Sequence, residues 1–354
     1  QFVYYGAPSG LGATAGWTAE GNQADAQFGI SVSTAGDVNG DGYADVIVGA
    51  PNFDNGENDE GRVYVFLGTA SGLSASAAWT AESNQAGACF GISLGSAGDV
   101  NGDGFADILV GASGQDAGGP GAGAAYLVMG KANPSSGGLN GSSGNTIYKY
   151  TGESSGDYAG IGVAGAGDVN GDGFDDILIG AEGSDSGGTD SGAAYLVLGS
   201  RQPSSGSLGS VWGDTIIQYS GEAGGDLAGF SLAGAGDVNG DNYADLLIGA
   251  RNYDDGGGDS GAAYLVLGSA HPCGDTLRDT AEDTIYRFTG ESTSDSAGSS
   301  VAGAGDIDGD GYADLLVGAE NNDDGGANAG AAYLLLGDLA THGADPMRQR
   351  HRLQ

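Results

Sequence analysis

The chain has 354 residues and a formal net charge of −37, with 47 acidic and only 10 basic side chains. Such a surface repels phosphate backbones and anionic headgroups, so the composition argues against binding to nucleic acid or to acidic membranes. Glycine supplies 74 residues, close to the composition of low-complexity chains, but a 39% hydrophobic content arranged in a regular repeat indicates one folded domain. No apolar run approaches the ~20 residues that a membrane helix needs.

The first predicted elements, in residues 2–20, form a partial repeat. They match residues 65–82, because both segments carry a Gly-Leu pair followed by Trp-Thr-Ala-Glu, at Trp17 and at Trp79. The chain therefore begins with the third and fourth strands of a repeat whose first two strands it lacks.

Each complete repeat then shows the same order of elements. A short strand (28–33 in the first copy) precedes an acidic loop, and an apolar strand ending in Gly-Ala (245–250 in the fourth) follows it. A Gly-rich acidic loop, a third strand such as 194–199, a longer loop and a fourth strand such as 283–291 complete the unit. The lengths and residue types are typical of strands, and no segment shows a helical period. Four strands per repeat indicate an all-β propeller of four-stranded antiparallel blades that must stack to bury their faces.

The acidic loop spans nine residues and is the strongest motif in the chain. Its first residue is an aspartate at positions 37, 99, 168, 237 and 306, so the copies recur after 62 residues and then three times after 69. Oxygen-bearing side chains occupy positions 1, 3, 5 and 9 of every copy. Position 6 is glycine or Asn242, which both tolerate positive φ, and position 7 is an aromatic residue expected to offer its carbonyl and bury its ring. The candidate metal ligands are Asp37, Asn39, Asp41, Tyr43, Asp45, Asp99, Asn101, Asp103, Phe105, Asp107, Asp168, Asn170, Asp172, Phe174, Asp176, Asp237, Asn239, Asp241, Tyr243, Asp245, Asp306, Asp308, Asp310, Tyr312 and Asp314.

These donors suit calcium, a hard cation that takes six to eight oxygens. An EF-hand begins similarly but needs Glu at position 12 and flanking helices, whereas position 12 here is Gly49 or its equivalent after an apolar strand. Toxin-like β-rolls repeat every nine residues, a much shorter period. One copy alone would be explained by turn chemistry; five copies with the same spacing favour about five bound calcium ions.

The residues around the loop resemble the FG-GAP repeat of the integrin α-subunit β-propeller. Phe28-Gly29 and Phe90-Gly91 precede the loop, and Gly49-Ala50-Pro51 follows it; later copies relax the first pair, as in Ala159-Gly160. The resemblance covers residues from about 2 to 337. It implies that the loop between the first two strands of each blade holds calcium on one face of the disc and that the opposite face binds ligands.

One departure from that family concerns ring closure. The family usually closes seven blades, whereas this chain has five complete loops. The predicted strands number 21, and five blades need 20; the Trp17 strand could complete the last blade and leave the Phe2 strand over. Three alternatives stay open: a closed five-bladed ring with an extra edge strand, a fragment of a larger propeller, or donation of the spare strand to a neighbouring molecule.

These elements predict a single domain over residues 1–337. Its repeats span about 21–82, 83–153, 154–222, 223–291 and 292–337, with 1–20 as the partial repeat and 338–354 as a flexible tail.

The calcium loops indicate an extracellular location, and the cysteines do not bear on it. Cys89 and Cys273 lie in non-adjacent repeats and are not expected to pair, and no zinc spacing occurs. The chain starts at Gln1 without a signal peptide, as expected after removal of a leader. Loops of this type fill at about 10⁻⁴–10⁻³ M calcium, an extracellular concentration, so secretion or display at the cell surface is expected.

Several other residues are candidates for ligand-binding or catalytic sites. A glutamate recurs before each first strand (Glu20, Glu82, Glu153, Glu222 and Glu291), either to contact a sugar or cation or, as favoured, to cap backbone N–H groups. The acidic loops 54–60, 185–190, 254–259 and 323–324 could hold further cations or form a solvated surface. Trp79 or Trp212 could stack on sugars, although packing between sheets is favoured. His271, His342 and His351 lie in a loop and the tail without a nucleophile–base pair, so an enzyme is disfavoured.

The sequence therefore predicts a secreted, calcium-binding, non-enzymatic propeller that binds an extracellular protein or polysaccharide in adhesion. The alternatives are a structural protein that polymerises by strand donation and a calcium-dependent lectin; a lyase or hydrolase ranks last.

Overall fold

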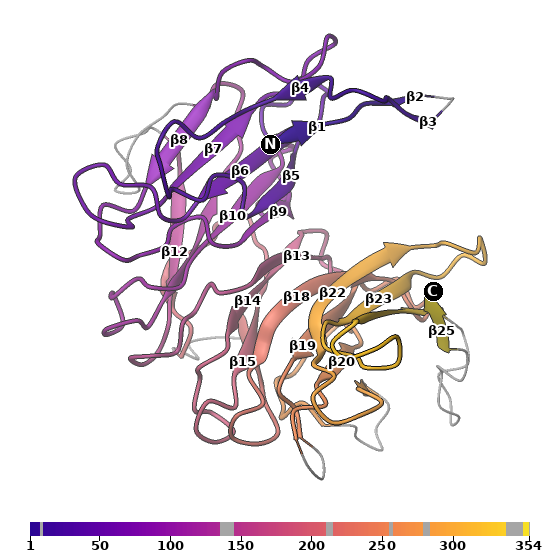
Figure 1. Ribbon diagram of the computed structural model, residues 1–354. Helices are drawn as coiled ribbons and strands as arrows, with labels where there is room; N and C mark the ends of the chain where they lie inside the picture. Colours follow the sequence, from indigo (N-terminus) through magenta and orange to yellow (C-terminus); the bar gives the residue numbers. More distant parts are fainter. Residues whose placement is uncertain are drawn as a thin grey trace.

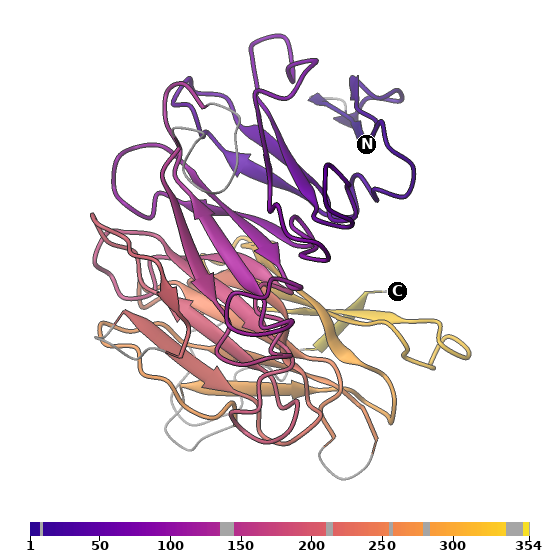
Figure 2. The ribbon, with the colours of Figure 1, turned by 90° about the vertical axis from the view of Figure 1, so that its left-hand side faces the viewer.

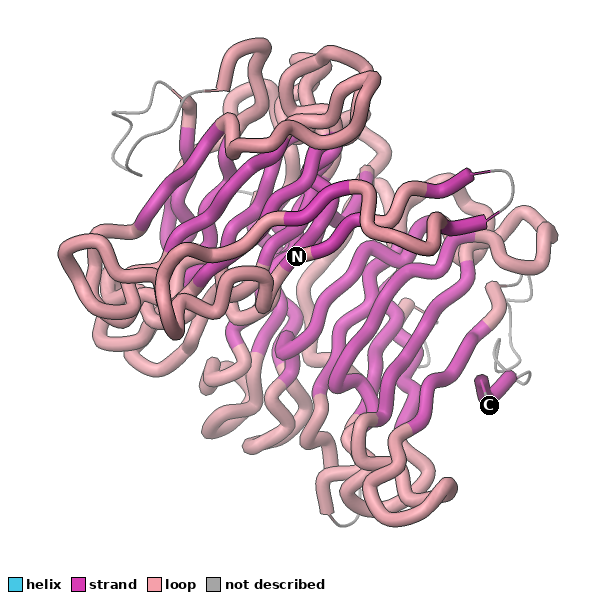
Figure 3. The backbone as a smooth tube through the Cα atoms, turned by 45° about the horizontal axis from the view of Figure 1, so that its top comes forward, coloured by secondary structure: helices cyan, strands magenta, loops and turns pink. Residues whose placement is uncertain are grey.

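The computed structural model describes residues 1–7, 10–134, 145–209, 215–254, 258–278, 284–337 and 350–353, the last segment by its backbone alone. Within these residues the protein consists of strands and loops only (Figure 3). The all-β prediction is confirmed for this part of the chain. The same residues contain no helix with the length and hydropathy of a membrane span.

Five four-stranded antiparallel sheets account for most of the structure, one for each repeat. The first contains β5 (Val32–Gly36), β6 (Asp45–Ala50), β7 (Arg62–Phe66) and β8 (Trp79–Glu82). The second contains β9 (Leu94–Gly98), β10 (Asp107–Ala112), β11 (Ala124–Val128) and β12 (Ile147–Thr151), with the short β16 (Gly206–Ser207) parallel to β12. The third contains β13 (Val163–Gly167), β14 (Asp176–Ala181), β15 (Ala193–Val197) and β17 (Ile216–Ser220). The fourth contains β18 (Ala228–Gly236), β19 (Asp245–Ala250), β20 (Ala262–Val266) and β21 (Ile285–Thr289). The fifth contains β22 (Ala297–Gly305), β23 (Asp314–Ala319), β24 (Ala331–Leu335) and β25 (Arg350–Leu353).

The hydrophobic core lies between neighbouring sheets. The second strands β10, β14 and β19 are buried at every residue, as expected for strands covered on both faces. Between the first and second sheets, for example, Trp79 of β8 packs with Ile108 and Tyr126. Each sheet is thus stabilised by its neighbours, which confirms that a blade of this kind cannot bury both faces alone.

The two glycine motifs that name the repeat allow this close stacking. A Cβ placed on Gly111, the glycine of one Gly-Ala ending, would collide with the backbone carbonyl of Gly160 in the next sheet. The same collision would occur between Gly180 and Gly229. Only glycine lets the two backbones approach this closely. The motif residues are therefore requirements of the interface between sheets.

The five sheets are arranged in an open arc (Figure 1). The first strands β5, β9, β13, β18 and β22 contact one another in that order. No comparable contact joins β22 back to β5 among the described residues. Figure 2 shows both chain ends on the same side of the molecule, where the first and last sheets stand apart. The architecture is consistent with a propeller whose ring is not closed by this chain.

The chain ends pair differently from the prediction. The Trp17 strand, β4 (Trp17–Thr18), does not complete the fifth sheet; it pairs with β1 (Phe2–Val3) in a two-stranded sheet. That proposed ring closure is wrong, because β25 lies on the edge of β24 where the Trp17 strand was expected. Within the tail, the backbone of Arg350–Leu353 forms β25 beside β24. A small hairpin of β2 (Gly6–Ala7) and β3 (Gly10–Leu11) extends from β1.

Candidate metal-binding loops

Each acidic loop folds around the carboxylate of its first aspartate. In the first loop, Asp37 Oδ1 accepts hydrogen bonds from the N–H groups of Gly40 (2.7 Å) and Asp41 (3.1 Å), and Oδ2 accepts one from Gly42 (2.8 Å). Asn39 Oδ1 accepts from the Asp41 N–H at 3.1 Å. The other four loops show the same type of wrapping, with Oδ2 of the first aspartate accepting the position-6 N–H. These hydrogen bonds bring the side chains at positions 1, 3 and 5 together within each loop.

The turn itself depends on positive φ at position 6. Gly42 has a φ of 87° and Asn242, its counterpart in the fourth copy, has a φ of 69°. The prediction that asparagine adopts the same backbone conformation as glycine here is confirmed.

The aspartate at position 9 clamps the loop to its own sheet. Asp45 Oδ2 accepts from the Val38 N–H at 2.9 Å, and Oδ1 accepts from the Gly68 N–H at 2.7 Å, just after the third strand. The equivalent pair of bonds occurs in all five copies. These carboxylates are fully buried. Their structural role was not predicted, because Gly68 follows Asp45 by 23 residues and is brought to it only by sheet pairing.

The acidic oxygens converge most closely in the fifth loop. One carboxylate oxygen from each of Asp306, Asp308 and Asp314 lies within 4.8 Å of the others. Carboxylates at this separation repel unless a cation or protons offset their charge. An all-oxygen donor set of this kind fits calcium better than zinc or copper, which favour nitrogen and sulfur.

The pKa values of the buried position-9 carboxyls show that a negative charge there is unfavourable without a neighbouring positive charge. Burial, reinforced by the aspartates at positions 5 and 1 of the same loop, raises the pKa of Asp107, Asp176 and Asp245 to about 7. Because a neighbouring divalent cation favours the ionised form, these groups are suited to a site whose charge a metal balances.

The aromatic residue at position 7 contacts the preceding loop. The ring of Phe105 lies over Gly40, and the rings of Phe174, Tyr243 and Tyr312 cover the corresponding glycine of the loop before them. These four rings are only partly buried, and Tyr43, which has no preceding loop, is 43% exposed. The prediction of buried rings is therefore wrong for Tyr43 and only partly correct for the others.

Two of the recurring glutamates, Glu153 and Glu222, bond to a neighbouring sheet and not to their own hairpins. The caps are supplied by later aspartates, since Asp157 Oδ2 accepts from the Glu153 and Ser154 N–H groups at 3.0 and 2.8 Å. Glu153 instead accepts a hydrogen bond from the Tyr195 hydroxyl of the next sheet at 2.7 Å. Glu222 accepts the Tyr264 hydroxyl in the same way, at 3.0 Å. The favoured capping interpretation is wrong because the partner lies 42 residues away, on a neighbouring sheet.

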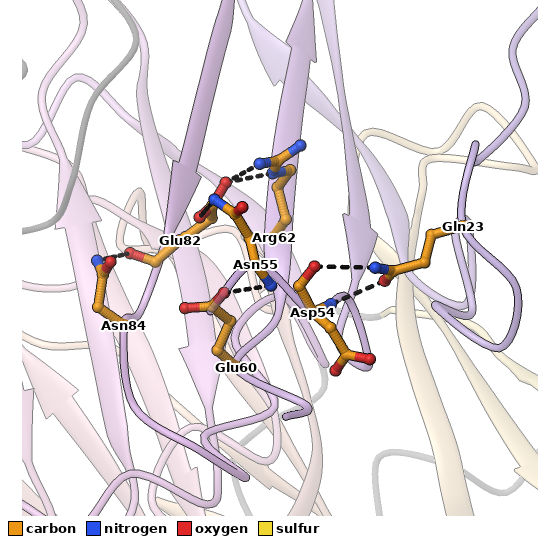
Figure 4. Close-up of polar contacts among 7 residues, drawn as sticks. All are labelled: Gln23, Asp54, Asn55, Glu60, Arg62, Glu82 and Asn84. Carbon is orange, nitrogen blue, oxygen red and sulfur yellow. Dashed lines mark hydrogen bonds and ion pairs between the residues drawn. The ribbon is translucent and has the colours of Figure 1, made fainter. Parts of the chain in front are cut away.

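One polar cluster breaks the repeat symmetry, in the acidic loop of the first sheet (Figure 4). Glu60 is 1% exposed, and its Oε1 accepts from the Asn55 N–H at 2.6 Å while Oε2 is buried without a partner. Burial raises the pKa of this carboxyl. The corresponding residues in the other repeats are Ala122, Ser191, Ser260 and Ala329.

Further polar contacts surround Glu60 in the first sheet (Figure 4). The Asn55 side chain donates to Glu82 Oε2 at 2.8 Å, and Arg62 forms an ion pair with the same carboxylate. The Arg62 guanidinium stacks on Phe53, 3.8 Å from the ring centroid. Gln23, in the segment between β4 and β5, makes two hydrogen bonds to the backbone of Asp54. No sequence motif marks this cluster; its only signal is the glutamate at a position where the other repeats carry alanine or serine.

The remaining candidates are dispersed. His271 and Cys273 line an open cleft of about 1070 Å³ beside β17, and both cysteines are free thiols. Trp79 is 1% exposed in the core, as favoured. Trp212, His342 and the His351 side chain lie outside the described residues.

Comparison with known proteins identifies the repeat. The FG-GAP repeat matches residues 28–66, 90–128, 159–197, 228–266 and 297–335, together more than half of the chain. Integrin alpha-E of Mus musculus is 35% identical over 164 residues, which is 46% of this chain and 14% of the relative. Integrin alpha-3 of Cricetulus griseus is 43% identical over 94 residues (26% and 9%), and integrin alpha pat-2 of Caenorhabditis briggsae is 43% identical over 90 (24% and 7%). The chain thus spans a small part of the length of these relatives. Five matched repeats, each forming one sheet, show that the chain belongs to the FG-GAP repeat family and resembles the N-terminal domain of integrin α subunits.

Proposed function

We propose that this protein is a secreted, calcium-stabilised β-propeller module that binds an extracellular protein or polysaccharide and has no catalytic activity. The observation that carries this proposal is the convergence of Asp306, Asp308 and Asp314 in a loop whose pattern occurs five times. The likeness to integrin α subunits supports an adhesive role. The proposed domain comprises residues 1–337.

Calcium would be held by the side chains at positions 1, 3, 5 and 9 of each loop, with the position-7 carbonyl, for about five ions in all. The ion would balance the charge of three or four neighbouring carboxylates. At tenfold over its Kd, each site adds roughly 1.4 kcal/mol to folding by linkage. Five sites would add about 7 kcal/mol, which is comparable to the ~5–15 kcal/mol stability of a domain.

Isothermal titration calorimetry tests the metal assignment. The intact chain is expected to bind about five calcium ions, and an Asp306→Asn, Asp310→Asn variant is expected to bind one fewer. Asp25→Asn, a change at an exposed aspartate outside the loops, is the control and leaves the stoichiometry unchanged. Equal stoichiometry in the double variant would remove the fifth loop from the assignment.

A binding screen tests the module function separately. The chain is immobilised and presented to a glycan array and to a panel of purified extracellular matrix proteins, in millimolar calcium and in chelator. Saturable binding that is lost in chelator supports the proposal. Turnover of a polysaccharide substrate, with release of new chain ends, would contradict the non-enzymatic assignment.

Self-assembly is the second candidate, and the observation that favours it is the open arc, in which β22 makes no contact with β5 comparable to those between neighbouring sheets among the described residues. Light scattering after size exclusion separates the two. A calcium-dependent mass near the 34.5 kDa monomer supports a binding module, whereas filaments or polydisperse species support a building block. A lectin is less well supported, since Trp79 is buried in the core.

A further inference from the structure

Neighbouring acidic loops are joined by one contact that recurs along the arc. The N–H at position 8 of the later loop donates to the carbonyl of the first aspartate of the earlier loop, from Ala106 to Asp37 at 3.0 Å, Ala244 to Asp168 at 3.0 Å and Ala313 to Asp237 at 2.9 Å. The position-7 ring of the later loop covers the position-4 glycine of the earlier one. Each loop is thus held to the loop before it by one backbone hydrogen bond and one ring.

The interface between the second and third sheets has an additional side-chain contact. Position 8 is alanine in four of the loops, but it is Asp175 in the third. Asp175 Oδ2 accepts a hydrogen bond from the Asp99 N–H at 2.8 Å, and the Asp175 N–H donates to the Asp99 carbonyl at 3.3 Å. Asp99 is the first aspartate of the second loop, so one residue of the next sheet holds both backbone groups of a candidate metal ligand.

The other interfaces have only one of these two bonds. Within the part of the chain that the structure describes, no side chain accepts the N–H of Asp37, Asp168 or Asp237. The alanine at position 8 of the following loop carries no acceptor that could do so. A Cβ on Gly98 would collide with the Asp175 carboxylate, so the glycine before Asp99 leaves the space that this side chain needs.

Asp175 lies between two candidate ligands of the third loop. Phe174 occupies position 7, whose carbonyl is a candidate donor, and Asp176 occupies position 9. The buried Asp176 carboxylate accepts hydrogen bonds from the Val169 N–H at 2.9 Å and the Gly199 N–H at 2.7 Å. Because each peptide unit is planar and joins consecutive residues rigidly, the backbone of Asp175 is restricted whenever the groups on both sides of it are fixed.

We propose that Asp175 is a positioning residue that couples calcium binding at the second and third loops. When the third loop holds a cation, its position-7 carbonyl and position-9 carboxylate are fixed, and Asp175 holds the Asp99 backbone through two hydrogen bonds. The second loop then loses less conformational freedom when it binds its own cation. Such coupling is reciprocal, so occupancy of the second loop raises the affinity of the third by the same factor.

This coupling rests on the calcium assignment proposed above and goes beyond it, because it makes two of the five sites depend on each other. The remaining interfaces, with alanine at position 8, serve as internal references. Their loops are expected to bind calcium with little influence on one another.

The hydrogen bonds and the charge of Asp175 have separable effects. A negative charge between the two loops attracts cations to both without linking them. Asp175→Asn keeps an oxygen that can accept the Asp99 N–H but removes the charge. Asp175→Ala removes both and introduces the residue that the other four loops carry at position 8. Positioning by hydrogen bonds therefore predicts that the asparagine variant retains the coupling and that the alanine variant loses it.

The test follows the two loops separately by NMR of the isotope-labelled full chain during titration with calcium chloride. The N–H groups of Gly104 and Gly173, at position 6, donate to Oδ2 of Asp99 and Asp168 at 2.8 and 2.9 Å. Their amide signals therefore report the second and third loops. Substitution of each glycine by asparagine identifies the two signals, since Asn242 has positive φ at the same position.

The coupling is measured by disabling the third loop with the double substitution Asp168→Asn, Asp172→Asn. The calcium concentration at half-saturation of the second loop is then read at Gly104. We expect this concentration to rise about fivefold in the unmodified chain and in Asp175→Asn. In Asp175→Ala we expect disabling the third loop to change it by less than about twofold.

The interface between the third and fourth loops is the matched control, because Ala244 occupies position 8 there. The fourth loop is disabled with Asp237→Asn, Asp241→Asn, and half-saturation of the third loop is read at Gly173. We expect a change of less than about twofold.

A measurement without metal tests the hydrogen bond itself. In chelator the amide hydrogen of Asp99 should exchange with solvent more slowly than that of Asp168, because only the former has a carboxylate acceptor. Asp175→Ala should abolish this difference, and Asp175→Asn should preserve it. Circular dichroism confirms that both variants are folded.

The possible results separate the coupling from the calcium assignment. Equal shifts at Gly104 in the unmodified chain and in Asp175→Ala, or an Asp175→Asn variant that behaves like Asp175→Ala, would overturn the coupling while calcium binding stands. A shift at the control interface as large as that at the second loop would also overturn it. If neither Gly104 nor Gly173 responds to millimolar calcium, the calcium assignment of these loops fails together with the coupling.

Discussion

Substitution of a Gly-Ala glycine tests whether the sheets are held together by backbone contact. A Cβ on Gly180 would lie 2.9 Å from the Gly229 carbonyl carbon and closer still to its oxygen, and neither atom can rotate away. In the fifth sheet the nearest atoms to the same Cβ on Gly318 belong to Ser300, whose hydroxyl can turn aside. Both glycines have backbone angles that alanine can adopt. The two substitutions therefore differ in what the new Cβ meets, which is immovable backbone of the following sheet at Gly180 and a rotatable hydroxyl of the same sheet at Gly318.

The expected magnitudes follow from these contacts. Heavy atoms in ordinary contact are 3.4–4 Å apart and the Gly229 carbonyl oxygen would lie 1.9 Å from the new Cβ, so Gly180→Ala must move the fourth sheet by about 1.5 Å. Overpacking of this kind costs typically 1–3 kcal/mol, and immovable backbone places it near the upper value of about 3 kcal/mol. For a chain of this size that is a fall in melting temperature of about 5 °C. Gly318→Ala should be neutral or raise stability slightly, because alanine restricts the unfolded chain.

Melting temperatures in millimolar calcium, followed by circular dichroism, provide the measurement. Stacked repeats can depart from two-state unfolding, so the comparison uses midpoints rather than extrapolated free energies. Size exclusion confirms that neither variant aggregates before melting. If Gly180→Ala and Gly318→Ala shift the midpoint equally, the sheets are not held in backbone contact and the explanation of the FG-GAP glycines is refuted.

Removal of calcium with a chelator should lower the melting temperature strongly, because each loop then retains unbalanced carboxylates; equal melting with and without calcium would exclude a structural role for the metal. Glu60→Ala should raise the midpoint at pH 7 by an amount corresponding to ~1–3 kcal/mol, since it removes a buried carboxylate oxygen without a partner; a lower midpoint would show that Glu60 has a stabilising partner in solution. Burial raises the pKa of Asp226 to about 6 in the folded chain, against about 3.9 in an unfolded chain. The contribution of this carboxyl to folding stability is therefore fully present below pH 4 and is lost as the pH rises through 6. The midpoint of Asp226→Asn should therefore exceed that of the unmodified chain at pH 8 and match it below pH 4, with Glu20→Gln, a change at an exposed carboxylate, as the control; a difference independent of pH would contradict the linkage.

Features set by neighbours in the chain were predictable from the sequence. The nine-residue loop, its turn at Gly42 or Asn242 and the apolar strand after it depend on contacts within about ten residues, which the residue pattern displays directly. Repetition of the pattern then predicted one four-stranded sheet per repeat. The family resemblance follows from the same local motifs.

Features that depend on the next sheet were predicted poorly. Glu153 was expected to cap its own hairpin, but its carboxylate accepts the Tyr195 hydroxyl of the following sheet. Closure of the ring by the Trp17 strand was one of three open alternatives, but this strand pairs with β1. The sequence pattern places Glu60 only within an acidic loop, although its side chain is buried. In each case the partner is distant in the chain, and a repeating sequence offers several equivalent partners.

The turns of the acidic loops, the strands and the presence of one four-stranded sheet per repeat thus follow from the sequence, since these arise from local backbone preferences and from a pattern that recurs at fixed spacing. The tertiary structure alone decided which faces are covered and which stay open. Val238 and Ile307 occupy the same loop position and have similar side chains, yet one is 4% and the other 55% exposed. The difference arises because burial depends on whether a neighbouring sheet is present, and a residue's own sequence context carries no record of that.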